Sequence, residues 1–194
     1  MSNGHIFVIS APSGSGKTTL CKEVLKKIKS LTPSVSLTTR KPRKDEKNAK
    51  DYHYVSKDAF KEEVEKGNLL EWEENFGYFY GTPKKFVLEN LKKGKSLLLS
   101  IDVKGAMVVK EKFPESTLIF IKPPSMKELS KRLKTRNTDN KKDIEKRLDI
   151  AKNELKYEKK YDYVVINDKL ENAVSEIISI IDNIKSLPAG RQGG

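Results

Sequence analysis

Short apolar runs alternate with longer amphipathic stretches along most of this chain. The apolar runs, such as Leu97-Leu98-Leu99, are typical of strands that are buried on both faces of a sheet. The longer stretches repeat their apolar positions every three or four residues, which predicts amphipathic helices. We expect strands over residues 6–10, 35–38, 52–55, 69–71, 96–101, 117–121 and 163–166. We expect helices over residues 17–29, 57–66, 83–93, 104–112, 125–135, 141–156 and 170–186.

The alternation of strand and helix predicts an α/β fold with a parallel sheet flanked by helices, because parallel neighbours need a crossover connection. Between residues 35 and 83 the strands are shorter and more polar, which predicts a small mixed β/α insertion on this core. A polar stretch over 136–142 joins two helices and is typical of a mobile flap. Residues 188–194 lack periodicity, and we expect a disordered tail there.

The length of 194 residues suits one α/β domain with an insertion, but not two full-sized domains. No apolar run approaches the roughly 20 residues that a membrane-spanning helix needs. Residues 1–4 lack the charged and apolar parts of a secretion signal. We therefore expect a cytoplasmic protein with no membrane partner.

Basic residues outnumber acidic ones, with 39 Lys and Arg against 27 Asp and Glu, for a net charge of +12. Such a charge suits the binding of polyanions, whether nucleotides or nucleic acid. Most of the excess is lysine on expected helical faces, such as Lys22, Lys26 and Lys146, with no aromatic residues between them. This pattern favours solvated helix surface over a nucleic-acid track. We expect no nucleic-acid partner, and the sequence leaves monomer and homo-oligomer equally open.

The single cysteine, Cys21, excludes an internal disulfide bond. With only His5 and His53 beside it, the sequence offers no cluster with zinc-ligand spacing. Cys21 falls on an expected helix, where a small buried thiol is favoured over a reactive one.

A glycine-rich segment, Ala-Pro-Ser-Gly-Ser-Gly-Lys-Thr, lies between an expected strand and an expected helix. A phosphate-binding loop requires this order, because glycines turn backbone N–H groups toward phosphate oxygens and the helix adds the positive end of its dipole. Lys17 adds a charge, and Thr18 offers a hydroxyl to Mg²⁺. The pattern's first glycine is Ala11, which costs little where φ is negative. We expect ATP contacts from Ala11, Pro12, Ser13, Gly14, Ser15, Gly16, Lys17, Thr18 and Thr19.

Five further residues are chemical candidates. Arg40 and Arg43 lie close together in a segment of small polar residues, and bidentate guanidinium groups grip a monophosphate better than lysine would. Asp102 ends an apolar run, so we expect it at the carboxyl edge of a parallel strand, where ligands of open α/β sheets bind. By pattern alone, Tyr52 and Tyr80 are as consistent with aromatic packing as with ligand binding.

Seven segments together resemble the guanylate kinase family in order and spacing. They are residues 11–18, 35–43, 51–55, 70–72, 77–82, 101–105 and 165–168. The resemblance spans about residues 4–187, and its Thr-Thr-Arg-Lys-Pro-Arg and Gly-Tyr-Phe-Tyr-Gly segments are specific to this family rather than to phosphate-loop proteins at large. It implies transfer of the γ-phosphoryl group of ATP to GMP, giving ADP and GDP, with Mg²⁺.

The resemblance also implies a set of site residues. For GMP they are Ser36, Arg40, Arg43, Tyr52, Glu71, Tyr80, Thr82 and Asp102. For ATP, beyond the loop, they are Arg132, Arg136 and Asn167, and the catalytic cations are Lys17, Arg136 and Arg147. Thr18 is the implied Mg²⁺ ligand. Glu71, which by pattern alone is more typical of a solvated charge, is assigned to guanine because a carboxylate accepts from both N1–H and the 2-amino group.

The resemblance further implies a division of the chain. A P-loop core covers 1–34, 84–125 and 158–187, a GMP-binding insertion covers 35–83, and a helical lid covers 126–157. Closure of the insertion and the lid would exclude water from the transfer, so we expect a large hinge movement when both substrates bind.

Two positions depart from the family pattern. The usual Asp two residues before Asp102 is Ser100, and the usual Gln after this motif is Lys104. The missing carboxylate could weaken the affinity for GMP or the discrimination of its base.

Three other interpretations stay open at this point. Another P-loop kinase, acting on a different phosphorylated acceptor, would have no need of Glu71. A noncatalytic interaction module with this fold would lack a working phosphate loop, whereas Gly16, Lys17 and Thr18 are all present. A nucleic-acid-binding protein would explain the charge but not the ordered motifs.

Overall fold

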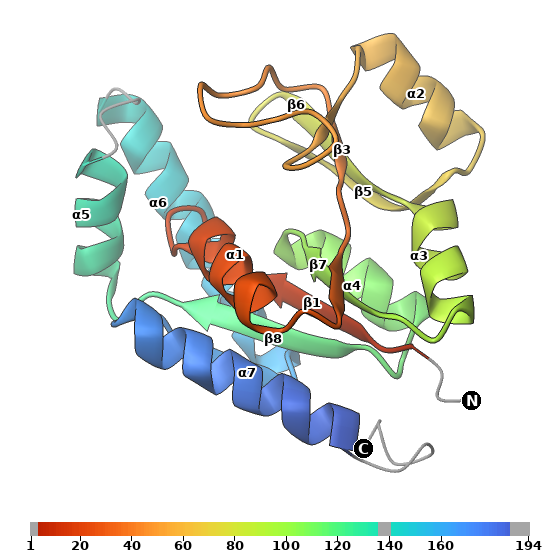
Figure 1. Ribbon diagram of the computed structural model, residues 1–194. Coiled ribbons are helices and arrows are strands. Elements are labelled where there is room, and N and C mark those ends of the chain that lie inside the picture. Colours follow the sequence, from red (N-terminus) through yellow and green to blue (C-terminus); the bar gives the residue numbers. More distant parts are fainter. Residues whose placement is uncertain (1–3, 136–140, 187–194) are drawn as a thin grey trace.

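A five-stranded parallel sheet forms the centre of the molecule (Figure 1). The computed structural model describes residues 4–135 and 141–186. The strand order is β2-β7-β1-β8-β9, with bounds Leu31–Pro33, Ser96–Ser100, Ile6–Ser10, Thr117–Lys122 and Tyr163–Ile166. Every neighbouring pair is parallel, and Phe7 on β1 lies opposite both Leu98 and Thr117. The apolar residues of β1, β7 and β8 are buried, as a sheet covered on both faces requires.

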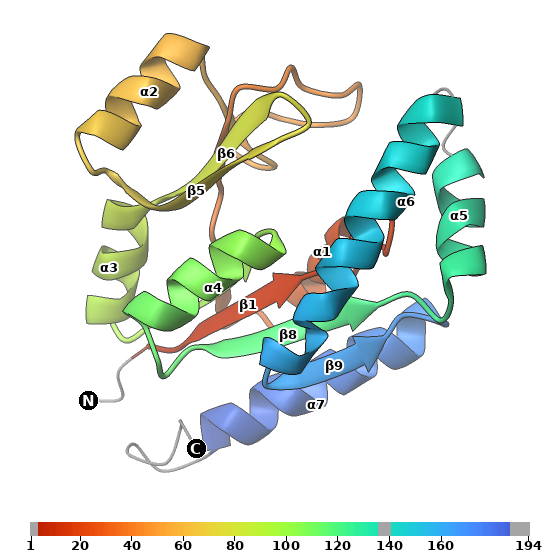
Figure 2. The ribbon, with the colours of Figure 1, turned by 180° about the vertical axis from the view of Figure 1, so that it is seen from behind.

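Helices cover both faces of this sheet. On one face, α1 (Lys17–Lys27) and α7 (Leu170–Ser186) pack against each other and against the strands through buried aliphatic side chains (Figure 1). On the other face, α4 (Val103–Lys112) and α3 (Lys84–Lys92) bury their apolar sides (Figure 2). Cys21 is buried on α1, as the sequence predicts. With both faces covered, the carboxyl ends of the strands form the edge where a ligand can bind.

A second, four-stranded sheet lies above the first in Figure 1. Its strand order is β4-β3-β6-β5, with bounds His53–Tyr54, Leu37–Thr38, Tyr78–Pro83 and Leu69–Asn75. Helix α2 (Lys57–Glu65) contributes the buried Phe60, which stacks on Phe79 with ring centroids 5.5 Å apart. The antiparallel strands β5 and β6 are joined by a tight turn at Phe76 and Gly77.

Two helices stand beside the carboxyl ends of the parallel strands (Figure 2). They are α5 (Met126–Thr135) and α6 (Lys141–Leu155), which pack through Leu129, Leu133 and Ala151. A 3₁₀ helix, Lys156–Lys160, then leads into β9. Most of the expected flap, including Arg136, and the expected tail at 188–194 lie outside the described residues.

The predicted fold class is confirmed: a parallel sheet is flanked by helices, and a small mixed sheet interrupts the chain between β2 and α3. Every expected strand and helix is present, most with bounds shifted by a few residues. The pattern does not predict β2, which is short and ends in proline, or β6, whose glycine and proline are typical of turns. Within residues 4–135 and 141–186, no helix combines the length and apolar character needed to cross a membrane.

Candidate active site

One large cleft brings most of the predicted site residues together. It has a volume of about 1040 Å³ and lies between the glycine-rich loop, the second sheet and helix α6. From the core, its lining includes Ala11, Pro12, Ser13, Gly14, Gly16, Lys17, Thr18, Thr19, Ser100 and Asp102. From the second sheet and its loops, the lining includes Ser36, Arg40, Arg43, Tyr52, Glu71 and Tyr80. The volume is at the upper end for a single small ligand, which leaves room for two nucleotides.

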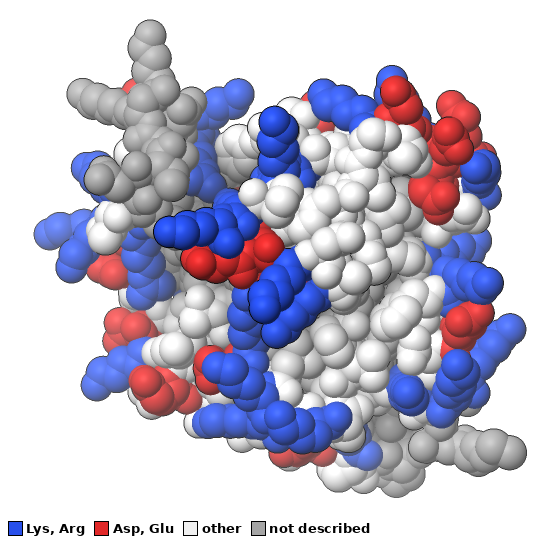
Figure 3. All heavy atoms as spheres, turned by 45° about the horizontal axis from the view of Figure 1, so that its top comes forward, with Lys and Arg blue, Asp and Glu red and all other residues white. Residues whose placement is uncertain are grey.

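Both signs of charge meet in this cleft. The cations that line it are Lys17, Arg40, Arg43, Lys146 and Arg147, and the carboxylates are Glu71, Glu73, Glu74, Asp102 and Glu154. Figure 3 shows Lys and Arg around much of the upper face, with Asp and Glu among them and a further acidic group over α2. A groove for a polyanion would be uniformly basic, so this mixture favours ligands that combine anionic groups with hydrogen-bond donors.

The glycine-rich loop connects β1 to α1 and depends on two left-handed glycines. Gly14 and Gly16 have φ of 93° and 90°, and Gly16 begins α1 without a side-chain cap, so the first N–H groups of the helix are left for a ligand. The side-chain amide of Asn167, at the end of β9, donates to the Ser15 carbonyl oxygen at 2.8 Å. A Cβ at Gly16 would collide with that amide. Ala11 is not among the residues with positive φ, so it fits the place of the usual glycine.

Lys17 lies at the floor of the cleft, where its Nζ donates to the carbonyl oxygen of Ile101 at 2.6 Å. Burial lowers the pKa of Lys17, although the nearby carboxylate of Asp102 opposes this effect. Asp102 follows β7 and caps α4, because its Oδ1 accepts from the backbone N–H groups of Lys104 at 3.1 Å and Gly105 at 2.9 Å. The loop lysine and this carboxylate therefore meet at the carboxyl edge of the sheet.

Arg40 is held by a carboxylate that the sequence analysis does not name. Its NH1 and NH2 donate to the two oxygens of Glu46, each at 3.0 Å, and Glu46 also accepts from the Arg43 backbone N–H and the Tyr54 hydroxyl. Burial disfavours the charged form of Glu46, but these donors, Arg40 first, outweigh it and lower its pKa to about 2. The Arg40 guanidinium also lies 5.4 Å from the centroid of the Tyr52 ring.

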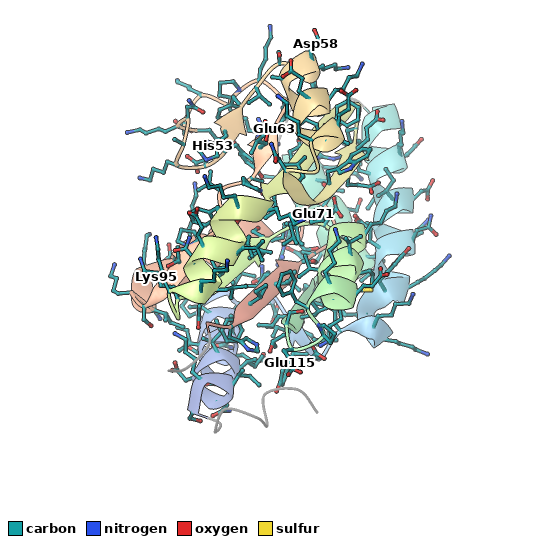
Figure 4. The ribbon with its side chains drawn as sticks, turned by 90° about the vertical axis from the view of Figure 1, so that its right-hand side faces the viewer. His53, Asp58, Glu63, Glu71, Lys95 and Glu115 are labelled. Atoms are coloured by element: carbon teal, nitrogen blue, oxygen red, sulfur yellow. The ribbon has the colours of Figure 1, made fainter. Side chains whose placement is uncertain are left out.

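Glu71 is the buried carboxylate of the second sheet. It comes from β5 and lies between that sheet and helices α3 and α4, whereas Asp58 and Glu63 lie out on α2 (Figure 4). Glu71 is only 5% exposed, and its Oε1 accepts from the Thr82 hydroxyl at 2.5 Å. Burial raises the pKa of Glu71 to about 7, against the hydrogen bond from Thr82. Its Oε2 occupies the space that a Cβ would take at Gly105.

Several other predicted site residues lie on the same side of the cleft as Arg40 and Glu71. Tyr52 and Tyr80 meet edge to face, with ring centroids 6.0 Å apart. Ser36 is buried and lines the cleft, while Ser100, from β7, lines it beside Asp102. The structure thus brings the predicted GMP residues of the second sheet and its loops to one side of the cleft, with Asp102 on the core side and Thr82 behind Glu71 rather than in the lining.

Helix α6 closes the far side of the cleft with Arg147 and Glu154. The Arg147 guanidinium lies 5.4 Å from the centroid of the Phe76 ring, at the tip of the β5–β6 hairpin. Burial raises the pKa of Glu154 to about 7. The hydrogen bond from the Ser13 N–H and the charge of Lys17 favour the ionised carboxylate and partly oppose this rise in pKa. Among the described residues, Glu154 Oε2 is buried without a hydrogen-bond partner.

Of the predicted ATP residues that the structure describes, three do not line the cleft: Ser15, which is buried within the loop, and Arg132 and Asn167, which lie behind it. Arg132 donates to Glu128 at 3.0 Å and to the carbonyl oxygen of Asn167 at 3.0 Å. Asn167 is buried against the loop backbone. Arg132 and Asn167 therefore support the loop from behind, and their predicted contact with the nucleotide stays a prediction.

The sequence analysis misses Phe76 and Glu154, which line the cleft, and Glu46, which holds Arg40 from outside the lining. A carboxylate three positions after Arg43 is the one available signal for Glu46, since the contact depends on the fold of the loop before β4. Glu154 lies seven residues after Arg147, about two helical turns, which places both on one face of α6. Phe76 carries no signal, because hairpin turns rarely hold aromatic residues.

Fold and site together define a P-loop kinase. A glycine loop lies between the first strand and the first helix, at the carboxyl edge of a parallel sheet, and a second group of arginines faces it across one cleft.

Comparison with known proteins gives the particular family. The sequence model described as guanylate kinase matches residues 3–184. The chain is 49% identical over 178 residues to a guanylate kinase of Caldanaerobacter subterraneus subsp. tengcongensis, covering 92% of this chain and 86% of that protein. It is also 49% identical to one of Wolbachia sp. subsp. Brugia malayi, over 180 residues that cover 92% of each. The crystal structure of guanylate kinase from Anaplasma phagocytophilum is similar, with a TM-score of 0.82 at 37% identity, covering 96% of this chain and 88% of that one. The chain belongs to the guanylate kinase family, as the sequence predicts.

Proposed function

We propose that this protein transfers the γ-phosphoryl group of ATP to GMP, giving ADP and GDP. The observation that carries the proposal is a single cleft with a phosphate loop on one side and a buried carboxylate, Glu71, on the other. An anion-binding cleft that accepts any nucleotide would have no use for a carboxylate held away from water. A buried acceptor selects a base with a matching pair of donors.

The donor side would bind the phosphates of ATP. The N–H groups of the loop and of the first turn of α1 suit phosphate oxygens, and Lys17 adds a cation beneath them. Lys17 now donates to the Ile101 carbonyl oxygen, so we infer that it exchanges this partner for a phosphate oxygen.

Mg²⁺ fits the donors present when the phosphates of ATP supply most of its ligands. No group of three or more His, Cys, Asp or Glu side chains that could hold a metal occurs in the described part of the chain. Mg²⁺ usually binds through one or two protein oxygens together with phosphates and water. The hydroxyl of Thr18, exposed at the start of α1, would be such a ligand. When bound, the ion neutralises charge on the transferring group.

The acceptor side would bind GMP through its phosphate and its base. Arg40 and Arg43, with Tyr52 and Tyr80, would hold the phosphate as hydrogen-bond donors. Glu71, which accepts a hydrogen bond from Thr82, would accept from the guanine N1–H and 2-amino groups, with Ser36 near the edge of the base. Asp102 would lie between the two substrates. The proposed GMP-binding insertion at 35–83 contains all of these residues except Asp102.

Transfer itself needs positioning and neutralised charge rather than covalent help from the protein. A phosphate oxygen of GMP attacks the γ-phosphorus, the bond to the bridging oxygen of ATP breaks, and ADP leaves with the electron pair. The proposed lid at 126–157 would bring Arg147, and with it Arg136, to the transferred group. Closure would also keep water from taking the phosphoryl group.

A coupled assay of ADP release across GMP, AMP, UMP and CMP tests this proposal. We expect turnover with GMP far above the other three, and loss of turnover in Lys17→Met, whose melting temperature checks that it is folded. Turnover with AMP above that with GMP would contradict the acceptor assignment. Cytoplasmic location and the lack of a nucleic-acid partner stay predictions.

A further inference from the structure

Phe76 occupies a turn position that aromatic residues rarely take. With Gly77 it forms the two-residue link between β5 and β6, and the two residues have φ of 53° and 77°. Turns with both central residues at positive φ favour Asn-Gly, because a bulky side chain is strained in this conformation. Phe76 is 42% exposed, so burial in the core does not account for its aromatic side chain. Strain that the fold does not need is a reason to look for a functional contact.

The ring of Phe76 has such a contact across the cleft. The guanidinium carbon of Arg147, on α6, lies 5.4 Å from the ring centroid, within the range of a cation–π interaction. Both residues line the cleft, and they come from elements that are well separated in the chain. The hairpin belongs to the proposed acceptor side, and α6 belongs to the proposed lid.

We propose that Phe76 is a positioning residue for Arg147: its ring holds the guanidinium over the cleft and links the β5–β6 hairpin to helix α6. This inference rests on the proposed function, in which Arg147 acts on the transferred phosphoryl group. An arginine side chain has many rotamers, and ordering its guanidinium at the moment of transfer adds to the barrier. The aromatic ring lowers that cost by restricting the guanidinium beforehand. Loss of the ring should therefore lower kcat more than it changes KM for GMP.

Phe76→Asn separates this role from a structural one. Asparagine suits the turn better than phenylalanine, so the melting temperature should stay equal or rise. We expect kcat to fall about 3- to 30-fold, the range that a lost cation–π contact implies, with KM for GMP nearly unchanged. Phe76→Tyr keeps a ring and should retain kcat within about twofold. Phe86→Asn, an exposed aromatic on α3 outside the cleft, is the matched control and should leave kcat unchanged.

A double-mutant cycle with Arg147→Ala tests whether Phe76 acts through Arg147. In the Arg147→Ala background, Phe76→Asn should have no further effect on kcat. A full effect of Phe76→Asn in that background, or unchanged kcat for either single variant, would overturn the proposal.

NMR gives a readout that does not depend on activity. The Arg147 side-chain protons should carry a ring-current shift that Phe76→Asn abolishes and Phe76→Tyr retains. Absence of that shift in the parent protein would overturn the contact itself. Failure of the proposed function would instead be seen as a parent protein that does not phosphorylate GMP while the NMR shift is present.

Discussion

Lowering the pH from about 8 to about 6 should raise KM for GMP about tenfold, because the pKa of Glu71 is raised to about 7. The guanine edge offers two donors, and only the ionised carboxylate accepts both. Near pH 8 about nine-tenths of Glu71 is ionised, and near pH 6 about one-tenth, so the binding-competent fraction falls about tenfold. The preference for GMP over AMP should become smaller as the pH falls over the same range, because the protonated carboxyl can donate a hydrogen bond as well as accept one.

The assay is steady-state ADP release at saturating ATP, with KM for GMP measured across this pH range. The phosphate of GMP titrates near pH 6 as well, so the control is Glu71→Gln, which keeps the shape of the side chain but does not ionise. The variant should have a higher KM for GMP at neutral pH, and its remaining pH dependence should be that of the phosphate alone. The same pH profile of KM in both proteins would refute the role of Glu71.

The raised pKa of Glu71 also makes the free energy of unfolding depend on pH, in the direction opposite to that of a carboxylate whose pKa is lowered by folding. Burial favours the neutral acid, so between about pH 4.5 and about pH 7 the folded state binds more protons at Glu71 than the unfolded state does. This contribution to stability is present in acid and is lost as the pH rises. At about pH 8, Glu71→Gln should therefore be up to about 3 kcal/mol more stable than the parent protein in urea unfolding, and near pH 4.5 the two should be equal.

Four further predictions follow from individual contacts. Gly105→Ala should raise KM for GMP and leave KM for ATP unchanged, because its Cβ would displace Glu71 Oε2; equal effects on both would contradict this. Glu46→Gln should raise KM for GMP, since Arg40 loses its bidentate partner, whereas a lower KM would mean that Glu46 competes with the substrate phosphate. Ala49→Gly should raise the free energy of unfolding by about 0.5 kcal/mol, because Ala49 has φ of 60°, and a loss of stability in urea would argue against strain there. A bisubstrate analogue should reduce the radius of gyration in solution scattering, and an unchanged value would count against closure of the lid and the insertion.

Most of the fold follows from the sequence because hydrophobic periodicity is strong in the elements that form the core. The buried run of β1 and the amphipathic pattern of α7 are visible in the chain, and the structure has both at the predicted bounds. Strand β6 is not visible, because its partners β3 and β5 impose extended structure on a segment that contains turn residues.

The candidate site likewise has residues that the sequence predicts and residues whose role depends on the tertiary structure. The phosphate loop can be predicted because its glycines and Lys17 are consecutive in the chain. By pattern alone, Glu71 is more typical of a solvated charge, because nothing local indicates that β5, Thr82 and Gly105 will enclose it. The bidentate pairing of Arg40 with Glu46 and the contact of Arg147 with Phe76 likewise depend on tertiary structure.

The hydrogen bond from Asn167 to the Ser15 carbonyl oxygen joins residues 152 positions apart. During synthesis on the ribosome, the amino-terminal segment therefore emerges long before the strand that completes its support. A nascent chain stalled before β9 should bind ATP poorly even though every residue of the loop has already been made. Nucleotide binding by this protein would thus begin only after β9 has emerged and docked, which delays the onset of activity until Asn167 has been made.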